Sequence, residues 1–296
     1  MTGAAPVRQS GSFADGSSGQ RFRLVHEPSG RDPLGTVLFV HAFAEEMNKS
    51  RRMAARMARL LAGDGWRVVQ RDLCGCGDSS GEFADATWAD WVRDVDDELA
   101  QALPQRPVWL WCHRAGALLA RTALQTRPDA ALLLWQPVLL GELHLQQFLR
   151  LHAGARITGS AKAHNDPPPL QQLRAGSAVE VGGYRLHPSL AIGLAGTQFD
   201  VPDGHNGRIV WLEVSIDETP GLSPHSERVL SRLRQRGLDV ETEVVKGPMF
   251  WQTVEIEDCD TLLDRTRARL AMPAPSAMTA SHQSAQTDAC STDSAR

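Results

Sequence analysis

An arginine occupies the tip of a predicted strand–turn–helix junction, the place where many enzymes present a nucleophile. The apolar run VWLW leads into five residues and then into a helix of small side chains; the five are Cys112, His113, Arg114, Ala115 and Gly116. In a nucleophile elbow these positions read G-x-S-x-G. A guanidinium is protonated at any working pH and cannot attack a substrate. Either the alignment is accidental, or the junction has kept its shape and lost its usual nucleophile.

Composition limits the chemistry that the rest of the chain can supply. The 296 residues carry a net charge of −4 and no long basic block, so the charge pattern gives no indication of nucleic acid. The five cysteines do not resemble a disulfide framework, and Cys74 and Cys76 have no second cysteine pair to complete a metal site. We therefore expect neither a metal nor a cofactor.

Targeting signals are also missing from the pattern. No apolar run approaches the roughly 20 residues that span a bilayer. The first residues lack the apolar centre of a secretory signal. The expectation is a cytoplasmic protein without a membrane span.

Short apolar runs alternate with helical patterns, and these elements must position the junction. Strands are predicted over 36–43, 66–73, 107–112, 130–138, 208–214 and 238–245. The intervening helices include one that Gly63 can end and one that begins at Thr87 in a capping-box pattern with Asp90. Such alternation predicts an α/β protein with a mostly parallel sheet covered on both faces.

Composition shifts divide the chain into a core, an insertion and two tails. The predicted divisions are a disordered tail at 1–20, a core at 21–140 and 204–272, a cap insertion at 141–203, and a disordered tail at 273–296. The insertion contains a predicted hairpin around Gly182 and Gly183. It is long enough to form a lid over the core.

The segment VVQRDLCGCGDSSGEF resembles the D-x-x-G-x-G-x-S stretch of α/β hydrolases. The matching residues are Asp72, Gly75, Gly77, Asp78 and Ser79. In that superfamily the stretch follows the strand before the elbow helix. Its glycines allow the chain to turn with positive φ beneath the site.

Two further stretches extend this resemblance. The residues from His41 to Phe43 stand where many hydrolases carry H-G-x-x and use a backbone N–H in the oxyanion hole, with Ala42 replacing the glycine. The elbow matches in its strand, its last glycine and its helix, and departs at Cys112 and Arg114. The resemblance implies an α/β-hydrolase fold, with a mostly parallel central sheet, helices on both faces and a small inserted cap.

Three motifs point to a narrower group. The stretches FAEEMNKSRRM, HRAGALLA and GPMFWQTVEIE look like the exosortase A system-associated hydrolases, specifically the group called hydrolase 2, over about residues 21–272. Genes of that group accompany exopolysaccharide and PEP-CTERM protein-sorting loci. The resemblance therefore implies a role, and a protein partner, in an exopolysaccharide system. It does not establish an activity, because fold and function are separable.

The resemblance implies a triad in the order serine, acid, histidine. The acid should follow the strand at 208–214, where Asp217 and Glu218 stand. The histidine should follow the strand at 238–245, where the chain instead carries Met249, Phe250 and Trp251. Without serine and histidine, an ordinary serine-hydrolase mechanism is not expected.

The helix that follows Arg114 predicts a carboxylate partner for it. A helix start disfavours a cation by roughly 0.3–1 kcal/mol, and Glu45 and Glu46 follow the first core strand within reach in this fold. Two interpretations remain open. The ion pair can fill a dead site, or the guanidinium can bind a carboxylate or phosphate on a ligand.

These considerations place a small acyl or anionic ligand between core and cap. The candidate ligand-binding residues are Arg114, Phe43, Ala115, His113 and Trp251, and the candidate catalytic bases are Asp217, Glu46 and Glu45. Two functions remain: a hydrolase or transferase with an unorthodox water-activating set, or a catalytically dead binding or scaffold protein of the same system.

Overall fold

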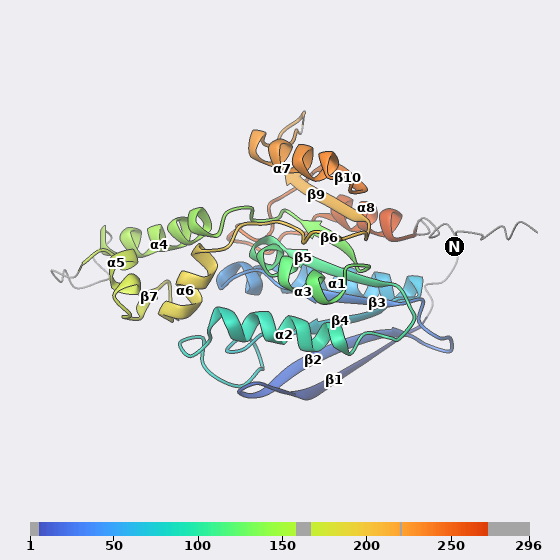
Figure 1. Ribbon diagram of the computed structural model, residues 1–296, viewed down its shortest axis with the longest axis horizontal. Coiled ribbons are helices and arrows are strands. Elements are labelled where there is room, and N and C mark those ends of the chain that lie inside the picture. The colour runs from blue at the N-terminus through green and yellow to red at the C-terminus, as the bar shows by residue number, and fades with distance from the viewer. Residues whose placement is uncertain (1–5, 158–166, 220, 272–296) are drawn as a thin grey trace, which may run out of the picture.

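A twisted central sheet organises the protein (Figure 1). The structure, a computed structural model, describes residues 6–157, 167–219 and 221–271. Within them, eight strands form the order β1-β2-β4-β3-β5-β6-β9-β10. The strands are β1 Val7–Gly16, β2 Gly19–Pro28, β3 Thr36–Val40, β4 Arg67–Arg71, β5 Val108–His113, β6 Ala131–Trp135, β9 Ile209–Ser215 and β10 Val240–Lys246. Pairing is parallel from β4 to β10 and antiparallel at β1–β2 and β2–β4. The predicted mostly parallel sheet is confirmed.

The N-terminal prediction of disorder over 1–20 is wrong for the described part. Strand β1 pairs with β2 along its whole length, from Val7 opposite Pro28 to Gly16 opposite Gly19. Most β1 side chains are exposed, so the strand carries no apolar alternation for sequence reasoning to detect. Backbone hydrogen bonds to β2 hold this edge strand in place of core packing. The predicted tail at 273–296 lies outside the described residues.

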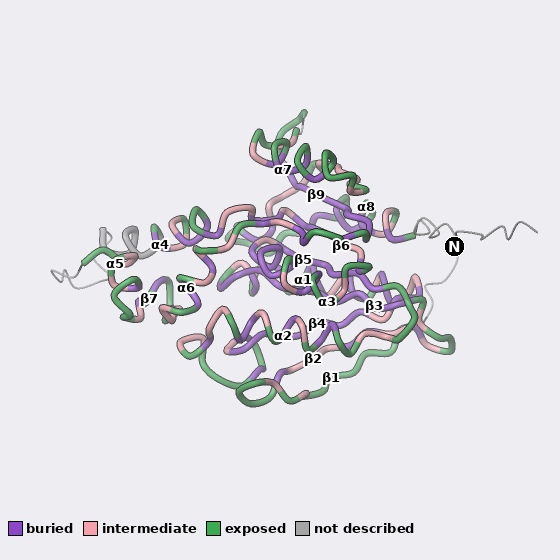
Figure 2. The backbone as a smooth tube through the Cα atoms, in the orientation of Figure 1, coloured by how far each residue is buried: buried purple, intermediate pink, exposed green. Residues whose placement is uncertain are grey.

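Two helical layers cover the sheet, and the central strands between them are buried (Figure 2). Helices α1 Glu45–Asp64 and α8 Asp260–Ala271 pack against one face, where Met53, Met57 and Leu262 join strand residues in one core. The opposite face is covered by α2 Trp88–Ala100, α3 Ala120–Thr126 and α7 Pro224–Gln235. No helix in the described residues is both long and apolar enough to cross a membrane.

Capping residues in the sequence account for the start of α2 and the end of α1. The predicted capping box is present, because the Asp90 N–H donates to the Thr87 hydroxyl at 3.1 Å and the Thr87 N–H donates to the Asp90 carboxylate at 3.1 Å. Helix α1 does not end at Gly63 as predicted. It continues to Asp64 and is closed by Gly65 at φ 112°, a left-handed cap that suits glycine.

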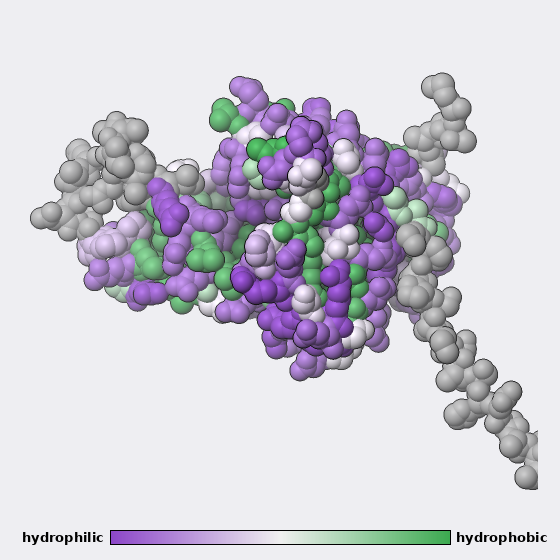
Figure 3. Space-filling model, turned by 90° about the horizontal axis from the view of Figure 1, so that it is seen from above, coloured by the Kyte–Doolittle hydropathy of each residue, from purple (hydrophilic) through white to green (hydrophobic). Residues whose placement is uncertain are grey.

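The segment between β6 and β9 extends from one end of the sheet (Figure 1). It contains α4 Gly141–Ile157, α5 Pro169–Arg174, the strands β7 Val179–Val181 and β8 Tyr184–Leu186, and α6 Pro188–Ala195. The predicted hairpin at Gly182 and Gly183 is confirmed by the antiparallel pairing of β7 with β8. A Cβ at Gly141 would lie 1.8 Å from the Leu194 carbonyl, so glycine lets α4 start against α6. Seen from above, apolar side chains gather on this segment beside the core (Figure 3).

A buried ion network joins β2, β4 and α2 beneath the loop that follows β4. The Asp94 carboxylate accepts hydrogen bonds from Arg21 Nε at 2.9 Å, from the Cys74 N–H at 2.7 Å and from Arg71 Nη2 at 3.5 Å. The side chains of Arg21 and Asp94 are 0% exposed, and that of Arg71 is 1% exposed. Sequence patterns did not identify this network, because its three charges lie on three different elements.

Candidate functional site

Strand β5 enters a tight turn at Arg114, which has φ 52°. Non-glycine residues rarely adopt such a left-handed conformation, and an elbow requires it to aim the side chain away from the sheet. A Cβ at Gly116 would lie 2.5 Å from the Val40 carbonyl oxygen, so glycine is needed where the turn crosses the end of β3. The predicted junction is present, although its first turn is the 3₁₀ helix η1 Arg114–Leu119 and α3 follows it.

The Arg114 guanidinium binds Glu46, at the start of α1. Its Nε lies 3.2 Å from both Glu46 carboxylate oxygens, and Nη2 lies 2.9 Å from Oε1. Nη1 donates to the Gln136 carbonyl at 3.5 Å, and the group lies 5.4 Å from the centre of the Trp251 ring. The two charged side chains are 12% and 18% exposed. The expected carboxylate partner is therefore Glu46.

Glu45 turns toward the inserted hairpin instead of toward Arg114. Its Oε2 accepts a hydrogen bond from the Tyr184 hydroxyl at 2.9 Å and another from Asn48 Nδ2 at 3.2 Å. Because successive residues on a helix point about 100° apart, Glu45 and Glu46 cannot serve the same partner from one turn. Glu45 thus ties the insertion to α1.

His113 is sealed inside the core, so its predicted contact with a ligand is not supported. Its Nδ1 lies 3.3 Å from the Trp135 carbonyl oxygen and its ring stacks on Phe250 at 5.4 Å. Burial, followed by the charge of Arg114, lowers the pKa of His113 to about 3, so the imidazole is neutral near pH 7. Its position before the elbow tip places it in the strand layer.

A serine–imidazole couple does exist in the protein, between Ser50 Oγ and His113 Nε2 at 2.9 Å. The Ser50 hydroxyl also donates to the Glu46 carbonyl at 2.6 Å, as helical serines do toward the preceding turn. Ser50 is 3% exposed and His113 is 1% exposed. Neither residue lines the two cavities described below. The couple is a buried packing contact, because a nucleophile must reach its substrate.

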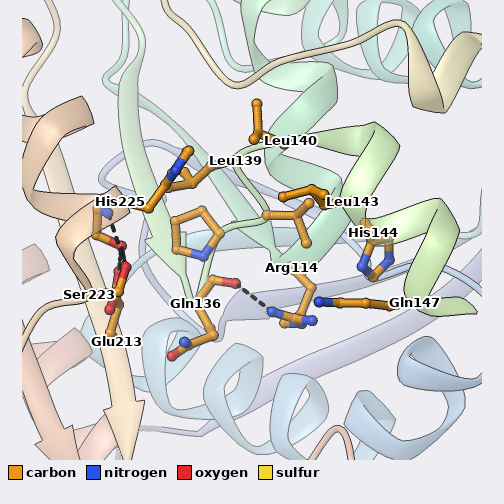
Figure 4. A pocket seen from close by; sticks show the side chains of 13 residues that line it. Arg114, Gln136, Leu139, Leu140, Leu143, His144, Gln147, Glu213, Ser223 and His225 are labelled. Atoms are coloured by element: carbon orange, nitrogen blue, oxygen red, sulfur yellow. Dashed lines mark hydrogen bonds between the residues drawn. The ribbon is translucent and has the colours of Figure 1, made fainter.

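Two cavities meet at the Arg114–Glu46 ion pair. The larger, of about 330 Å³, is lined by Phe43, Glu45, Glu46, Lys49, His144, Gln147, Phe148, Trp251 and Gln252. The smaller, of about 210 Å³ (Figure 4), is lined by Arg114, Gln136, Pro137, Val138, Leu139, Leu140, Leu143, His144, Gln147, Glu213, Ser223, His225 and Ser226. His144 and Gln147 face both, so α4 closes the space over the elbow.

Of the expected ligand-binding residues, Phe43 and Trp251 line the larger cavity and Arg114 lines the smaller one. Ala115 is buried directly after Arg114 in η1. Helix starts leave their first N–H groups without helical acceptors, so the Ala115 N–H is a donor at this end of the elbow. These placements agree with a binding cleft at the elbow.

The structure does not bring Asp217 into this cleft. The residue is exposed in the loop after β9, where the Ser215 hydroxyl donates to its carboxylate at 2.9 Å. Asp217 does not line either cavity, and the neighbouring Glu218 pairs with Lys246 at 2.6 Å. The sequence placed an acid in the expected loop, but this carboxylate faces solvent.

Sequence reasoning missed His144, Gln147 and Glu213. His144 and Gln147 are spaced i, i+3 on α4 and therefore share one face of the helix. This spacing could have identified them as a pair, but only with the knowledge that the insertion packs over the elbow. Glu213 lies within β9, where its carboxylate accepts hydrogen bonds from Trp211 Nε1 at 2.8 Å and the Ser226 hydroxyl at 2.6 Å. The hydrogen bond from Ser226 connects the first turn of α7 to the sheet.

The four cysteines within the described residues do not provide an alternative nucleophile. Cys74, Cys76, Cys112 and Cys259 are free and buried, and burial raises the pKa of each thiol. A raised pKa keeps the thiol protonated and unreactive. The described part of the chain also contains no cluster of three metal-ligating side chains.

Residues 31–171 match a family model described as serine aminopeptidase, S33. No curated protein matches the sequence. The matched span contains the elbow and the strand and loop that precede it.

Solved structures are similar over nearly the whole described chain. Est1E from Butyrivibrio proteoclasticus, with ferulic acid bound, is 13% identical with a TM-score of 0.58, covering 88% of this chain and 97% of that one. A soluble variant of monoglyceride lipase from Saccharomyces cerevisiae is 13% identical with a TM-score of 0.60, covering 89% and 95%. The mouse alpha/beta hydrolase domain-containing protein 10 is 18% identical with a TM-score of 0.51, covering 88% and 98%. Identities this low establish the shared fold alone.

Proposed function

We propose that this chain, which has the α/β-hydrolase fold, binds a small acyl or anionic ligand at the elbow without hydrolysing it. One observation carries this proposal: Arg114 stands at the tip of the elbow, in the strained backbone conformation of a nucleophile, and is held there by Glu46. A guanidinium can hold an anion at this position but cannot form an acyl intermediate.

The loss of a general base supports the same proposal. After β10, Phe250 and Trp251 are buried where the resemblance implies a histidine. Trp251 instead lies against the Arg114 guanidinium. Serine attack depends on a nucleophile and a base acting together, so the replacement of both removes the mechanism, while the pocket remains.

The lining of the cavities supports a ligand with an apolar part and a charged part. The larger cavity contains Phe43, Phe148 and Trp251, and the smaller one contains an aliphatic wall from Val138 to Leu140. Mostly apolar walls with a few placed polar groups are typical of small-molecule sites, and the larger cavity fits this description, while the smaller cavity has a more polar lining. The inserted segment between β6 and β9 would act as the cap of this cleft, and the residues on either side of it would form the core.

The biological setting rests on the resemblance to the exosortase A system-associated hydrolase 2 group. It supports a cytoplasmic role in an exopolysaccharide and PEP-CTERM sorting system, in which the protein would present or sense its ligand for a partner protein. A catalytically dead scaffold of that system, with no ligand, is the alternative outcome of the test below.

Ligand-induced thermal stabilisation, measured alongside turnover, tests the proposed function. A panel of carboxylates, phosphates, esters and thioesters should contain compounds that raise the melting temperature of the wild-type protein but are not consumed. A ligand at 100 times its Kd stabilises by about 2.7 kcal/mol. Arg114→Ala should lose most of this shift, because the charged end of the ligand loses its partner.

The matched control is Arg121→Ala, which removes an exposed arginine at the start of α3 that pairs with Asp200, and this variant should keep the full shift. Turnover that is abolished by Glu46→Gln would instead establish an enzyme. Absence of any stabilising compound, together with a co-purified protein, would favour the scaffold.

A further inference from the structure

The guanidinium of Arg114 has unused donors at the wall of the smaller cavity. Arginine carries five N–H bonds. Nε and one N–H of Nη2 meet Glu46, and one N–H of Nη1 meets the Gln136 carbonyl. One N–H on each terminal nitrogen therefore remains without an acceptor among the described residues. Two such parallel N–H bonds are the geometry that a carboxylate accepts.

His144 provides the second observation. The residue is 7% exposed, and its Nε2 is buried without a hydrogen-bond partner in the described part of the chain. That nitrogen lies 3.9 Å from Glu46 Oε2, just beyond hydrogen-bonding distance. Figure 4 shows His144 and Gln147 together on α4, on the side of the cavity where the Arg114 guanidinium ends. Buried polar groups without partners are rare and call for an explanation.

Charge balance connects these two features. The ion pair of Arg114 and Glu46 is neutral, so an entering carboxylate would place two negative charges against one guanidinium in a poorly solvated space. An uncompensated charge there is costly. A proton on His144 would offset the charge of the entering carboxylate and would give Nε2 a hydrogen to donate toward Glu46.

The other charged groups around His144 are poorly placed to take this role. From α1, the half-buried Lys49 lines the larger cavity, but its Nζ is directed to the Gln252 carbonyl oxygen at 3.5 Å. Glu45 on the same helix is occupied by Tyr184. From β9 and α7, Glu213 and His225 line the smaller cavity, and Glu213 adds a further negative charge.

We propose that the elbow binds a monocarboxylate with an apolar tail, sharing Arg114 between the ligand and Glu46, and that His144 takes up one proton from solvent as the ligand binds. The tail would lie along Val138, Leu139 and Leu140, which form the aliphatic wall beside Arg114. This inference rests on the proposed function and names its ligand class. It makes His144 a positioning residue for the complex.

The direction of the pH effect follows from the two states of His144. In the unliganded protein burial lowers the pKa of His144 to about 4, opposed by Glu46 and reinforced by Arg114. A ligand carboxylate raises the pKa of His144 in two ways. It adds a negative charge near the imidazole, and it offsets the positive potential of Arg114. Protons are therefore taken up on binding, and affinity increases as pH falls from 8 toward 6. The limit is about tenfold in affinity per pH unit for one proton.

Isothermal titration of the full chain with octanoate, in two buffers of different ionisation enthalpy, measures this proton uptake. The wild type should bind octanoate with uptake of up to one proton and with affinity that falls between pH 6 and pH 8. Glu46→Gln should bind more tightly at pH 8 and with little uptake, because the amide leaves Arg114 free for the ligand. His144→Gln should bind more weakly at pH 6 and lose the pH dependence. His187→Gln, which changes a histidine at the start of α6, is the matched control.

Octanoate binding without proton uptake, or uptake that persists in His144→Gln, overturns this inference and leaves the proposed function standing. If octanoate fails to bind both the wild type and Glu46→Gln, while another compound stabilises the protein through Arg114, the ligand class is wrong. If no compound of the panel binds, the proposed function fails as well.

Discussion

Arg114→Ser should restore the expected hydroxyl at the elbow and still leave the protein without useful esterase activity. The new serine would lack an effective base, because Trp251 lies against the tip of the elbow, His113 is sealed beside Ser50, and burial lowers the pKa of His144 to about 4. Loss of a triad serine or histidine costs on the order of a million-fold in a serine protease where each has been removed. We therefore expect this variant to hydrolyse p-nitrophenyl butyrate at most roughly a thousand-fold faster than water does. That is the residual acceleration that substrate binding and backbone donors give without a triad.

The comparison for this experiment is Arg121→Ser, which places a serine on the exposed surface of α3. Both variants should hydrolyse the ester at similar low rates. Saturable turnover that appears in Arg114→Ser alone, and that disappears on a further change of His144, would mean that the cleft has retained a base.

Asp94→Asn should be the most destabilising conservative change in the core. The carboxylate is 0% exposed and faces Arg21 and Arg71. The amide would leave the buried Arg21 without its counter-charge, while Arg71 would keep its pair with Glu98. Removal of one partner from a buried ion pair costs about 3–5 kcal/mol, a large part of the stability of an ordinary domain. Urea denaturation followed by circular dichroism should show a midpoint far below that of the wild type, or a protein that fails to fold.

Asp258→Asn is the matched control, because Asp258 also pairs with two arginines, Arg52 and Arg56, but does so at the surface. Exposed pairs contribute about 0–1 kcal/mol. If the two variants show the same small loss of stability, Asp94 does not carry the charge balance of the buried network.

Much of the fold could be predicted from the sequence because its strands are buried on both faces. Every residue of β3 and β5 is buried, and such continuous apolar runs mark central parallel strands. The elbow could also be predicted from the sequence, because the strand is followed by Gly116 and a helix of small residues, as such a sharp turn requires. Arg114 then required a nearby carboxylate on electrostatic grounds alone, and the structure supplies Glu46.

The features that escaped prediction depend on tertiary contacts. Strand β1 is held by backbone pairing, which leaves no trace in an exposed and polar sequence. The choice of Glu46 over Glu45 depends on the rotation of α1 about its axis. His144 was hidden because its role depends on where α4 packs, and no local pattern in the insertion records that α4 closes over the elbow.

A crystal structure of the protein with octanoate tests the central claim most directly, namely that the elbow holds a binding guanidinium in place of a nucleophile. The account predicts an intact carboxylate in the smaller cavity, with its oxygens about 2.7–2.9 Å from Nη1 and Nη2 of Arg114. An octanoyl group bonded covalently to a side chain, or a carboxylate bound away from Arg114, would contradict it.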